Sequence, residues 1–498
     1  MKKLILMSCL LAATLTIFAQ PQDGGDIVIG KYRTIDSKIL GEQRQILVNL
    51  PAGYENTELK YPVVFHLYGD FVMTYFADAA SFLERLHSFR IMPGVVLVGV
   101  DNTDRYRDLR PLKPDGSQGG ADKFAQYFEE ELIPFLKENY RISDYRILAG
   151  PQAGACFGFY TLIEHPGLFD AFVLENSFDN PKPIDDYLIS KAEKFFKEQK
   201  SLSKFLYIKT GVNSTNYQFS LEQQKVIEKY KPGGLRFKFE NSGSVNYLIE
   251  TGFMNGFMEL FSGYRLPDSV ALKGLDEILK YYENYSEEIG FKVDVSDNTL
   301  HFAASMLNNA GRKNEAKKIY EYILSINPKS LDGLFQMGQI YSSEGKYDEA
   351  IRCYLEFLKL RPQETMVRNI LQRNEKIIKE SSVYQIEQTI KSHGVEEGRE
   401  LYLTLKKNNP EKKYFDENEF IAAGYRFMNN GNMKDAIEIF QMAVESFPQS
   451  FNTWDSLGEV YMKAGENNLA IKNYEKSLEL NPGNENARKF LEQLRSNE

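Results

Sequence analysis

Residues 145–154 read Tyr-Arg-Ile-Leu-Ala-Gly-Pro-Gln-Ala-Gly, an apolar run that ends in the pattern Gly-x-Gln-x-Gly. The run Arg146–Ala149 predicts a short buried strand, and Ala155–Glu164 predicts a helix. The two glycines between them permit a sharp, strained turn, which pushes the middle residue out above the sheet. We therefore expect a strand, a tight turn and a helix, with Gln152 at the tip of the turn.

Further apolar runs surround this stretch from about residue 26 to residue 264. Several are continuous rather than alternating, which is typical of strands buried on both faces of a mainly parallel sheet. Helical patterns separate them, notably Gly120–Glu138. This alternation predicts a three-layer α/β fold. The predicted strands are Gln45–Leu50, Val63–Tyr68, Val95–Val100, Arg146–Ala149, Phe172–Leu174, Phe205–Lys209 and Leu235–Phe239.

The same region resembles the esterase D-like family of α/β-hydrolases, which includes siderophore, feruloyl and acyl esterases. The resemblance implies an α/β-hydrolase fold with a three-layer α/β/α arrangement and a mostly parallel sheet. It also implies that the Gly-x-Gln-x-Gly turn is the nucleophile elbow of that fold. The motifs that carry the resemblance are Leu47–Tyr54, Val98–Asn102, Arg107–Pro111, Gly119–Phe124, the elbow itself and His165–Asp170.

The resemblance also implies a catalytic triad, and the sequence departs from it. The nucleophile position holds Gln152, whose neutral amide cannot attack an acyl group. The position of the histidine, after the last strand, holds Ser242, and a hydroxyl cannot act as a general base near neutral pH. After the strand Phe205–Lys209, where the acid is expected, no carboxylate occurs before Glu222. We therefore predict a degenerate triad.

Two residues are candidates for an alternative catalytic constellation. His66 ends a predicted central strand, and Ser177 follows the strand Phe172–Leu174. The alternative interpretations are a hydrogen-bonded core histidine and an ordinary polar loop serine. No pair of histidines has the spacing of a metal site, so we expect neither a metal nor a cofactor.

A third group of residues keeps the family pattern in loops that border the expected pocket. These residues are candidates for ligand binding without turnover: Asp101, Arg107, Asp108, Gln118 and Gly119. The alternative for Arg107 and Asp108 is that they pair with each other and fix a loop.

Beyond residue 296 the sequence repeats itself with a period of 34 residues. The pattern resembles the tetratricopeptide repeat, which implies an all-α solenoid of paired helices. Small residues are expected to let the two helices of a repeat approach closely, and aromatic residues to fill the spaces between repeats. The recurring positions are Gly311, Ala316, Tyr320 and Pro328, then Gly345, Ala350, Tyr354 and Pro362, then Gly431, Ala436, Phe440 and Pro448, then Gly465, Ala470, Tyr474 and Pro482.

These patterns divide the chain into seven segments. The spacing between the second and third repeats is not a multiple of 34 residues, which indicates an irregular element between them. Within this element, Ser382–Lys407 predicts a helical hairpin that turns at Gly394. The segments are a signal peptide (1–20), an esterase-like domain (26–265), a helical junction (266–296), two repeats (297–364), an irregular helical connector (365–416), two further repeats (417–484) and a capping helix (485–498).

The N-terminus and the composition limit location and partners. Met1–Lys3, the apolar run Leu4–Phe18 and Ala19 predict a secretory signal peptide, so we expect a periplasmic or secreted protein without a membrane span. A signal anchor and a lipoprotein-type cleavage at Cys9 are the alternatives. The net charge of −9 and the pI near 5.5 argue against a nucleic-acid partner.

The leading hypothesis is therefore an exported esterase-like pseudoenzyme that acts as a scaffold. Its degenerate pocket would hold a small ester or sugar-derived ligand, and its repeat array would hold a peptide or protein partner. One alternative is an active carboxylester hydrolase with a non-standard catalytic constellation. Another is a structural role, in which the repeats only brace the first domain.

Overall fold

The computed structural model describes residues 28–67, 72–101, 104–176, 181–211, 217–242, 250–408 and 415–496. The predicted signal peptide and the candidate Ser177 lie outside these ranges. The described residues fall into two compact units. The first comprises the chain up to Ala52 and Lys60–Ser262, and the second comprises Gly53–Leu59 and the chain from Gly263 onward.

An eight-stranded sheet forms the centre of the first unit, with the strand order β1-β2-β4-β3-β5-β6-β7-β8. The pairs β1–β2 and β2–β4 are antiparallel, and every other neighbouring pair is parallel. This sheet is the mostly parallel one that the sequence predicted. The strands are β1 (Lys31–Ser37), β2 (Glu42–Asn49), β3 (Tyr61–His66), β4 (Val96–Val100), β5 (Ile142–Pro151), β6 (Ala171–Asn176), β7 (Phe205–Thr210) and β8 (Arg236–Asn241).

Burial explains which strands the sequence predicted and which one it missed. Every residue of β3, β4 and β7 is buried, as continuous apolar runs between two helix layers require. In β1 only Ile35 and Ser37 are buried, so this edge strand carries no apolar run. Its conformation is set by antiparallel pairing with β2 rather than by its own sequence.

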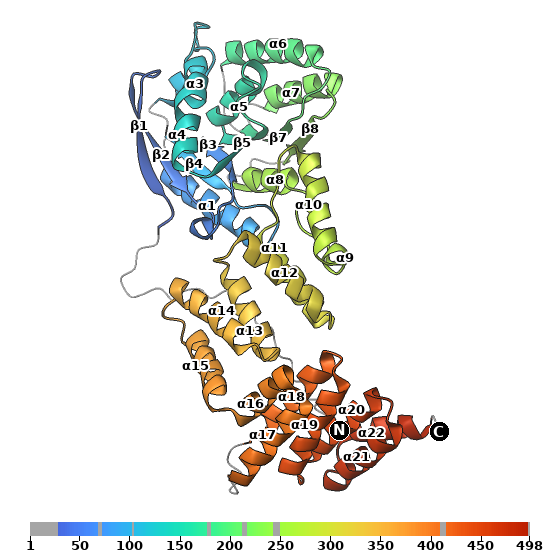
Figure 1. Cartoon of the computed structure of the whole chain (residues 1–498). Coiled ribbons are helices and arrows are strands. Elements are labelled where there is room, and N and C mark those ends of the chain that lie inside the picture. The colour runs from blue at the N-terminus through green and yellow to red at the C-terminus, as the bar shows by residue number, and fades with distance from the viewer. Residues whose placement is uncertain are drawn as a thin grey trace, which may run out of the picture. The chain divides into compact units, whose positions relative to one another are not determined.

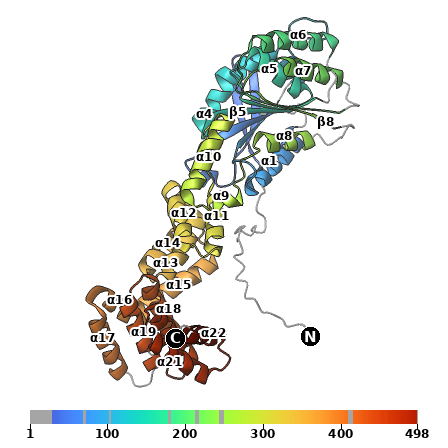
Figure 2. The same cartoon turned by 90° about the vertical axis from the view of Figure 1, so that its right-hand side faces the viewer.

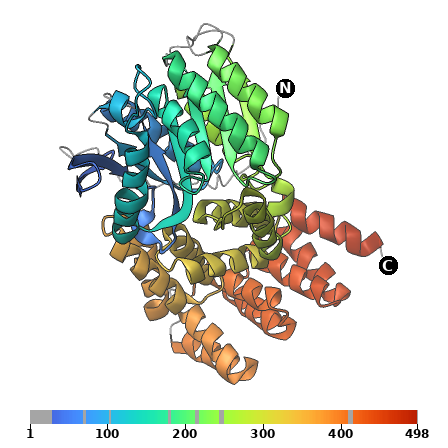
Figure 3. The same cartoon turned by 90° about the horizontal axis from the view of Figure 1, so that it is seen from above.

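Helices cover both faces of the sheet. Figure 2 shows α1 and α8 on one face and α4, α5, α6 and α7 on the other. Seen from above, the helices of the second group lie over the strands (Figure 3). The helices of this unit are α1 (Val72–Ser88), α2 (Arg105–Asp108), α3 (Ala121–Tyr127), α4 (Ile133–Asn139), α5 (Ala153–Glu164), α6 (Lys182–Glu198), α7 (Tyr217–Tyr230) and α8 (Glu250–Leu260).

The helix predicted over Gly120–Glu138 is interrupted. A π-helical segment, Phe128–Leu132, separates α3 from α4. Pro134 stands in the first turn of α4 and has no N–H to donate to the preceding turn. The wider π turn accommodates this missing donor, and it keeps Phe128 and Leu132 fully buried.

The second unit is almost entirely helical (Figure 1). Its repeats are the antiparallel pairs α11–α12, α13–α14, α18–α19 and α20–α21, and α22 follows the last pair. The helices are α9 (Asp268–Ala271), α10 (Leu275–Ile289), α11 (Asp297–Asn309), α12 (Lys313–Ile326), α13 (Leu331–Ser343), α14 (Tyr347–Leu360), α15 (Thr365–Glu380), α16 (Ser382–His393), α17 (Val395–Asn408), α18 (Glu417–Asn429), α19 (Met433–Ser446), α20 (Phe451–Lys463), α21 (Asn467–Leu480) and α22 (Glu485–Ser496). The short 3-10 helix Tyr54–Asn56 also belongs to this unit.

Glycines account for the 34-residue period. A Cβ at Gly424 would lie 2.5 Å from the ring of Phe440, and one at Gly458 would lie 3.0 Å from the ring of Tyr474. Both rings therefore pack against the glycine of their own repeat, and Tyr474 also stacks on Phe490 of α22, outside that repeat. A second set of glycines turns the chain between paired helices with left-handed φ angles of 77°, 72°, 82° and 82°: Gly311, Gly345, Gly431 and Gly465.

The connector between the two repeat pairs consists of α15, α16 and α17, and α16 and α17 form the predicted hairpin at Gly394. Arg426 of α18 holds this hairpin in place, because its Nε donates to Glu387 Oε1 at 2.8 Å and its Nη2 to Glu387 Oε2.

Within the described ranges, no helix of the chain has the length and apolar character needed to cross a membrane.

Candidate functional site at the elbow after β5

The turn between β5 and α5 has the backbone of a nucleophile elbow. Gln152 has φ 55° and ψ −121°, and it is one of three non-glycine residues with positive φ in the part of the chain that the structure describes. A Cβ at Gly150 would lie 2.8 Å from the carbonyl carbon of Gly154, and one at Gly154 would lie 2.6 Å from the carbonyl oxygen of Leu67. Only glycine fits at either position, so the strained turn is built into the packing.

Hydrogen bonds hold the elbow against the neighbouring strand and helix. The Gln152 N–H donates to the Glu175 carbonyl of β6 at 2.9 Å, and the Gln152 carbonyl accepts from the N–H of Ala155 at 3.0 Å. The side chain of Gln152 is half-buried at the start of α5. It places a neutral amide where an acyl-transfer enzyme of this fold has its nucleophile.

Ser242 directly follows β8, at the same carboxyl edge of the sheet as the elbow. Its N–H and its hydroxyl both donate to the Thr210 carbonyl of β7, at 2.9 Å and 3.2 Å. The residues after it, 243–249, and the loop after β7, 212–216, lie outside the described ranges. The candidate acid position after β7 belongs to that loop.

A cavity of about 230 Å³ adjoins the elbow strand between α1, α8 and the ends of β3, β5 and β6. Gly150 and Pro151 of β5 contribute to its wall, together with side chains from α1 and α8. The side chains on which the following argument depends are His66, Tyr75, Phe82, Val173, Glu175 and Phe253.

His66, the candidate for an alternative constellation, lines this cavity from the end of β3. It is 5 % exposed, and its ring lies edge-on to Phe253 with centroids 5.3 Å apart. Burial lowers the pKa of His66 to about 4, so the imidazole is neutral at neutral pH and a weak proton acceptor. This environment is that of a core histidine in the wall of a pocket.

Glu175 also lines the cavity and is not among the site residues predicted from the sequence. It lies opposite Pro151 on β5 and opposite Lys209 on β7, and its carboxylate is 3.9 Å from the Lys209 ammonium. Burial raises its pKa to about 8; Lys209 opposes this shift and Glu240 reinforces it. The sequence offers one signal for this site: the apolar strands β6 and β7 each contain a charged residue, Glu175 and Lys209. Only the register of the sheet shows that these two residues lie side by side.

A polar network continues from Glu175 beneath α8. Lys209 donates to the hydroxyl of Thr251, and Glu240 accepts from Tyr207 at 2.5 Å and from Asn255 at 3.1 Å. The network links the ends of β6, β7 and β8 to the first turns of α8. It supplies partners for buried charges that would otherwise be costly at this edge of the sheet.

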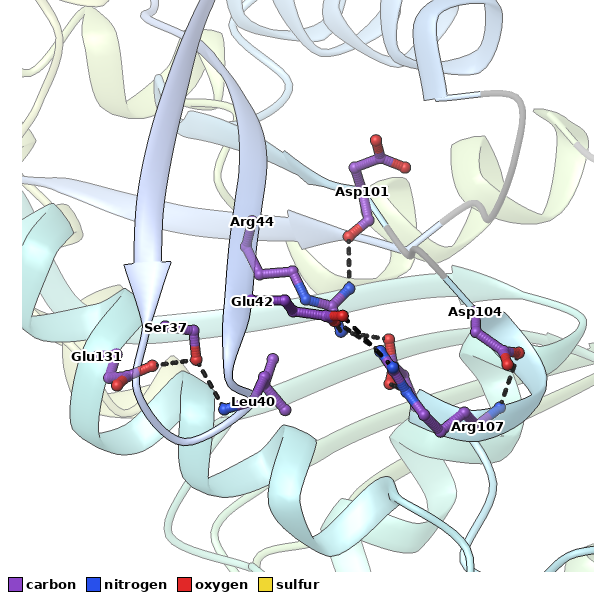
Figure 4. Close-up of polar contacts among 9 residues, drawn as sticks. Ser37, Leu40, Glu42, Arg44, Asp101, Asp104, Arg107 and Glu131 are labelled. Atoms are coloured by element: carbon purple, nitrogen blue, oxygen red, sulfur yellow. Dashed lines mark hydrogen bonds and ion pairs between the residues drawn. The ribbon is translucent and has the colours of Figure 1, made fainter.

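The predicted rim residues Arg107 and Asp108 belong to an ion-pair cluster with β2. Figure 4 shows Arg107 beside Glu42 and Arg44 of this strand. Arg44 Nη2 lies 2.6 Å from Asp108 Oδ2 and 2.7 Å from Glu42 Oε1. Arg107 pairs with the same two carboxylates, each at 2.7 Å. Asp108 and Arg44 are buried, so the cluster ties the loop around α2 to the sheet.

The remaining rim residues have backbone roles nearby. The Asp101 carbonyl accepts from Arg44 Nη1 at 3.4 Å, as Figure 4 shows. A Cβ at Gly119 would lie 2.1 Å from the Arg110 carbonyl oxygen, so this loop requires glycine there. Gln118 is exposed and forms an isolated bridge with Leu112. None of the five predicted ligand-binding residues lines the cavity beside the elbow.

Among the residues that the structure describes, no group of three or more His, Cys, Asp and Glu side chains is arranged to hold a metal ion. Cys156 lies in α5 and is buried, and Cys353 lies in α14 and is partly buried.

Family matches agree with this architecture. Residues 37–203 match the family described as "Putative esterase", and residues 331–364 and 451–484 match the tetratricopeptide repeat. An IroE-like serine hydrolase from Shewanella oneidensis has the same fold: the TM-score is 0.50 at 23% identity, over 59% of this chain and 99% of that one.

Two curated proteins are similar to parts of this chain. A tetratricopeptide repeat-containing protein of Methanocaldococcus jannaschii is 25% identical over 41% of this chain, and the human Superkiller complex protein 3 is 35% identical over 13%. This chain spans 35% and 4% of their respective lengths. By family match and fold, the chain is an esterase-like α/β-hydrolase domain joined to a helical array that contains tetratricopeptide repeats.

Proposed function

We propose that the esterase-like domain is a pseudoenzyme that binds a small ligand beside its elbow and does not turn over esters. One observation carries the proposal: the elbow keeps its strained backbone and both required glycines, while its tip holds Gln152. An amide nitrogen is not a nucleophile toward acyl groups, because its lone pair is delocalised into the carbonyl. Ser242, next to the end of β8, cannot replace the missing histidine base.

The retained elbow has a use in binding. The cavity beside it is lined by aromatic side chains and by a few polar groups, which is the composition of small-molecule sites. The Gln152 amide can donate and accept hydrogen bonds at the tip of the turn. Contact between a bound ligand and the elbow would explain why the strained turn is kept although its tip carries no nucleophile.

For the second unit and for the location we propose the roles that the sequence suggested. Stacked helical repeats present extended surfaces to peptides or proteins, so the array would recruit a partner to the esterase-like domain. The apolar run Leu4–Phe18 supports export, with a periplasmic or secreted mature protein.

Turnover of p-nitrophenyl butyrate by the mature full-length chain tests the proposal. Without nucleophile and base, kcat should lie roughly a millionfold below that of an intact triad. We therefore expect no rate above that of heat-denatured protein, either for the wild type or for Gln152→Ala. Saturable turnover that survives Gln152→Ala but disappears in His66→Ala would overturn the proposal in favour of a hydrolase with a non-standard constellation.

A further inference from the structure

The cavity beside the elbow has a chemically uneven lining. One face of α1 contributes Tyr75, Ala79 and Phe82, and α8 contributes Phe253, whose ring centroid is 6.4 Å from that of Phe82. Aromatic rings attract further rings in offset-stacked or edge-to-face contact, so these side chains suit a planar aromatic body. At about 230 Å³, the cavity is smaller than the pockets that take drug-sized ligands, so it suits a single-ring molecule.

The charged side chains of this lining lie on its exposed side. Asp78 and Arg85 are exposed, stand two turns apart on α1, and carry opposite charges. The buried polar groups are His66 and Glu175. Burial lowers the pKa of His66 to about 4 and raises that of Glu175 to about 8, so both are largely uncharged at neutral pH.

Glu175 is fixed at the deep end by its neighbours. A Cβ on Gly252 of α8 would lie 2.6 Å from its Oε2, so the backbone of α8 packs directly against the carboxyl group. Lys209 of β7 faces its other oxygen at 3.9 Å. The side chain is 12 % exposed, and that remaining surface borders the cavity.

We propose that this cavity binds a small uncharged aromatic molecule with one carbonyl-type acceptor, and that the Glu175 carboxylic acid donates a hydrogen bond to that acceptor. A protonated carboxyl group is both a donor and an acceptor, whereas an ionised one only accepts. The aromatic body contacts Phe82 and Phe253, and the acceptor points toward the end of β6. This inference rests on the proposed ligand-binding function and names its ligand class.

Three isosteric probes test the ligand class with the full-length protein at pH 7: benzamide, benzoate and benzamidine. They share size and shape and are neutral, anionic and cationic. We expect benzamide to bind at least about fivefold more tightly than either charged probe, because a charge entering the buried end is penalised by desolvation. Dissociation constants come from saturation-transfer NMR titrations. Tighter binding of either charged probe, or binding of none, would overturn the inference.

Two variants and the pH dependence test the donor. Glu175→Gln keeps an N–H donor and should hold benzamide within about twofold, whereas Glu175→Ala should weaken it about fivefold to tenfold. In the wild type, affinity should fall above about pH 8, as Glu175 ionises, and Glu175→Gln should remove that fall.

The groups that face Glu175 do not alter the expected fall in benzamide affinity above pH 8. Lys209 of β7, Glu240 of β8 and Thr251 of α8 remain in both variants, and His66 of β3 is already neutral throughout this range. A wild-type affinity that is unchanged between pH 7 and pH 9 would refute Glu175 as the donor. This wild-type measurement does not depend on either variant folding.

The ester assay and the binding assay test the two proposals independently, so each proposal can be contradicted without the other. Ester turnover would contradict the pseudoenzyme proposal even if benzamide binds as expected. Preferred binding of benzoate or benzamidine would contradict only the ligand class, since it would leave an inactive elbow beside an occupied cavity.

Discussion

Gly154→Ala should lower the free energy of unfolding of the first unit by about 3 kcal/mol. The new Cβ would meet the Leu67 carbonyl oxygen at 2.6 Å, and this contact is with backbone at the end of a central strand. Neither β3 nor α5 can move away without disturbing the sheet. The effect would show that the elbow depends on close backbone approach, not on its sequence pattern alone.

Urea unfolding followed by two signals measures this effect. The single Trp454 reports on the second unit by fluorescence, while far-ultraviolet circular dichroism follows both units. We expect Gly154→Ala to shift the dichroism transition and to shift the Trp454 transition much less. Gly167→Ala is the matched control, since a Cβ there meets nothing within 4 Å. Equal effects of the two substitutions would contradict the packing argument.

His66 should make the first unit less stable in acid by roughly 3 kcal/mol. Burial holds its folded-state pKa at about 4, compared with 6.5 in the unfolded chain. Between these values only the unfolded chain takes up the proton. The contribution of His66 is therefore complete above about pH 6.5, falls as the pH falls, and is lost below about pH 4.

Glu175 acts in the opposite direction over part of this range. Its folded-state pKa is about 8, compared with 4.5 when unfolded, so its contribution is present below about pH 4.5 and is lost as the pH rises through 8. The two effects partly cancel in the wild type between pH 4.5 and 6.5. The pH profile of the wild type alone therefore does not isolate His66.

Comparison with His66→Asn removes this cancellation, because Glu175 is present in both proteins. We expect the stability difference between wild type and His66→Asn to shrink by roughly 3 kcal/mol from pH 7 to pH 4. Urea unfolding at both pH values gives this difference. The same difference at pH 7 and pH 4 would mean that the imidazole is not held neutral in the folded state.

Much of the fold was predictable because its signals are local. Apolar runs, several of them continuous, predicted seven of the eight strands, and the two glycines around Gln152 predicted the elbow. Edge strand β1 was missed because β2 sets its conformation. The 34-residue period predicted the repeats and the close approach of their paired helices, but not that Phe440 and Tyr474 are the rings that meet the glycines.

The site was less predictable because it depends on register and on distant partners. Glu175 becomes conspicuous only when β6 aligns it with Lys209 and when α8 buries it. The pairing of Arg107 with Asp108 was one of two open interpretations. Their further partners Glu42 and Arg44 lie more than 60 residues earlier in the chain, and no sequence spacing connects them.

Fluorophosphonate labelling of the mature full-length chain tests most directly whether the elbow has lost its catalytic chemistry. The reagent reacts with activated serines, and peptide mapping identifies the position. We predict no labelled serine in the wild type, including Ser242 and Ser177, and none in Gln152→Ser, because a serine at the elbow still needs a base and the histidine position of the family holds Ser242. Stoichiometric labelling of one wild-type serine that is abolished by heat denaturation would contradict the account.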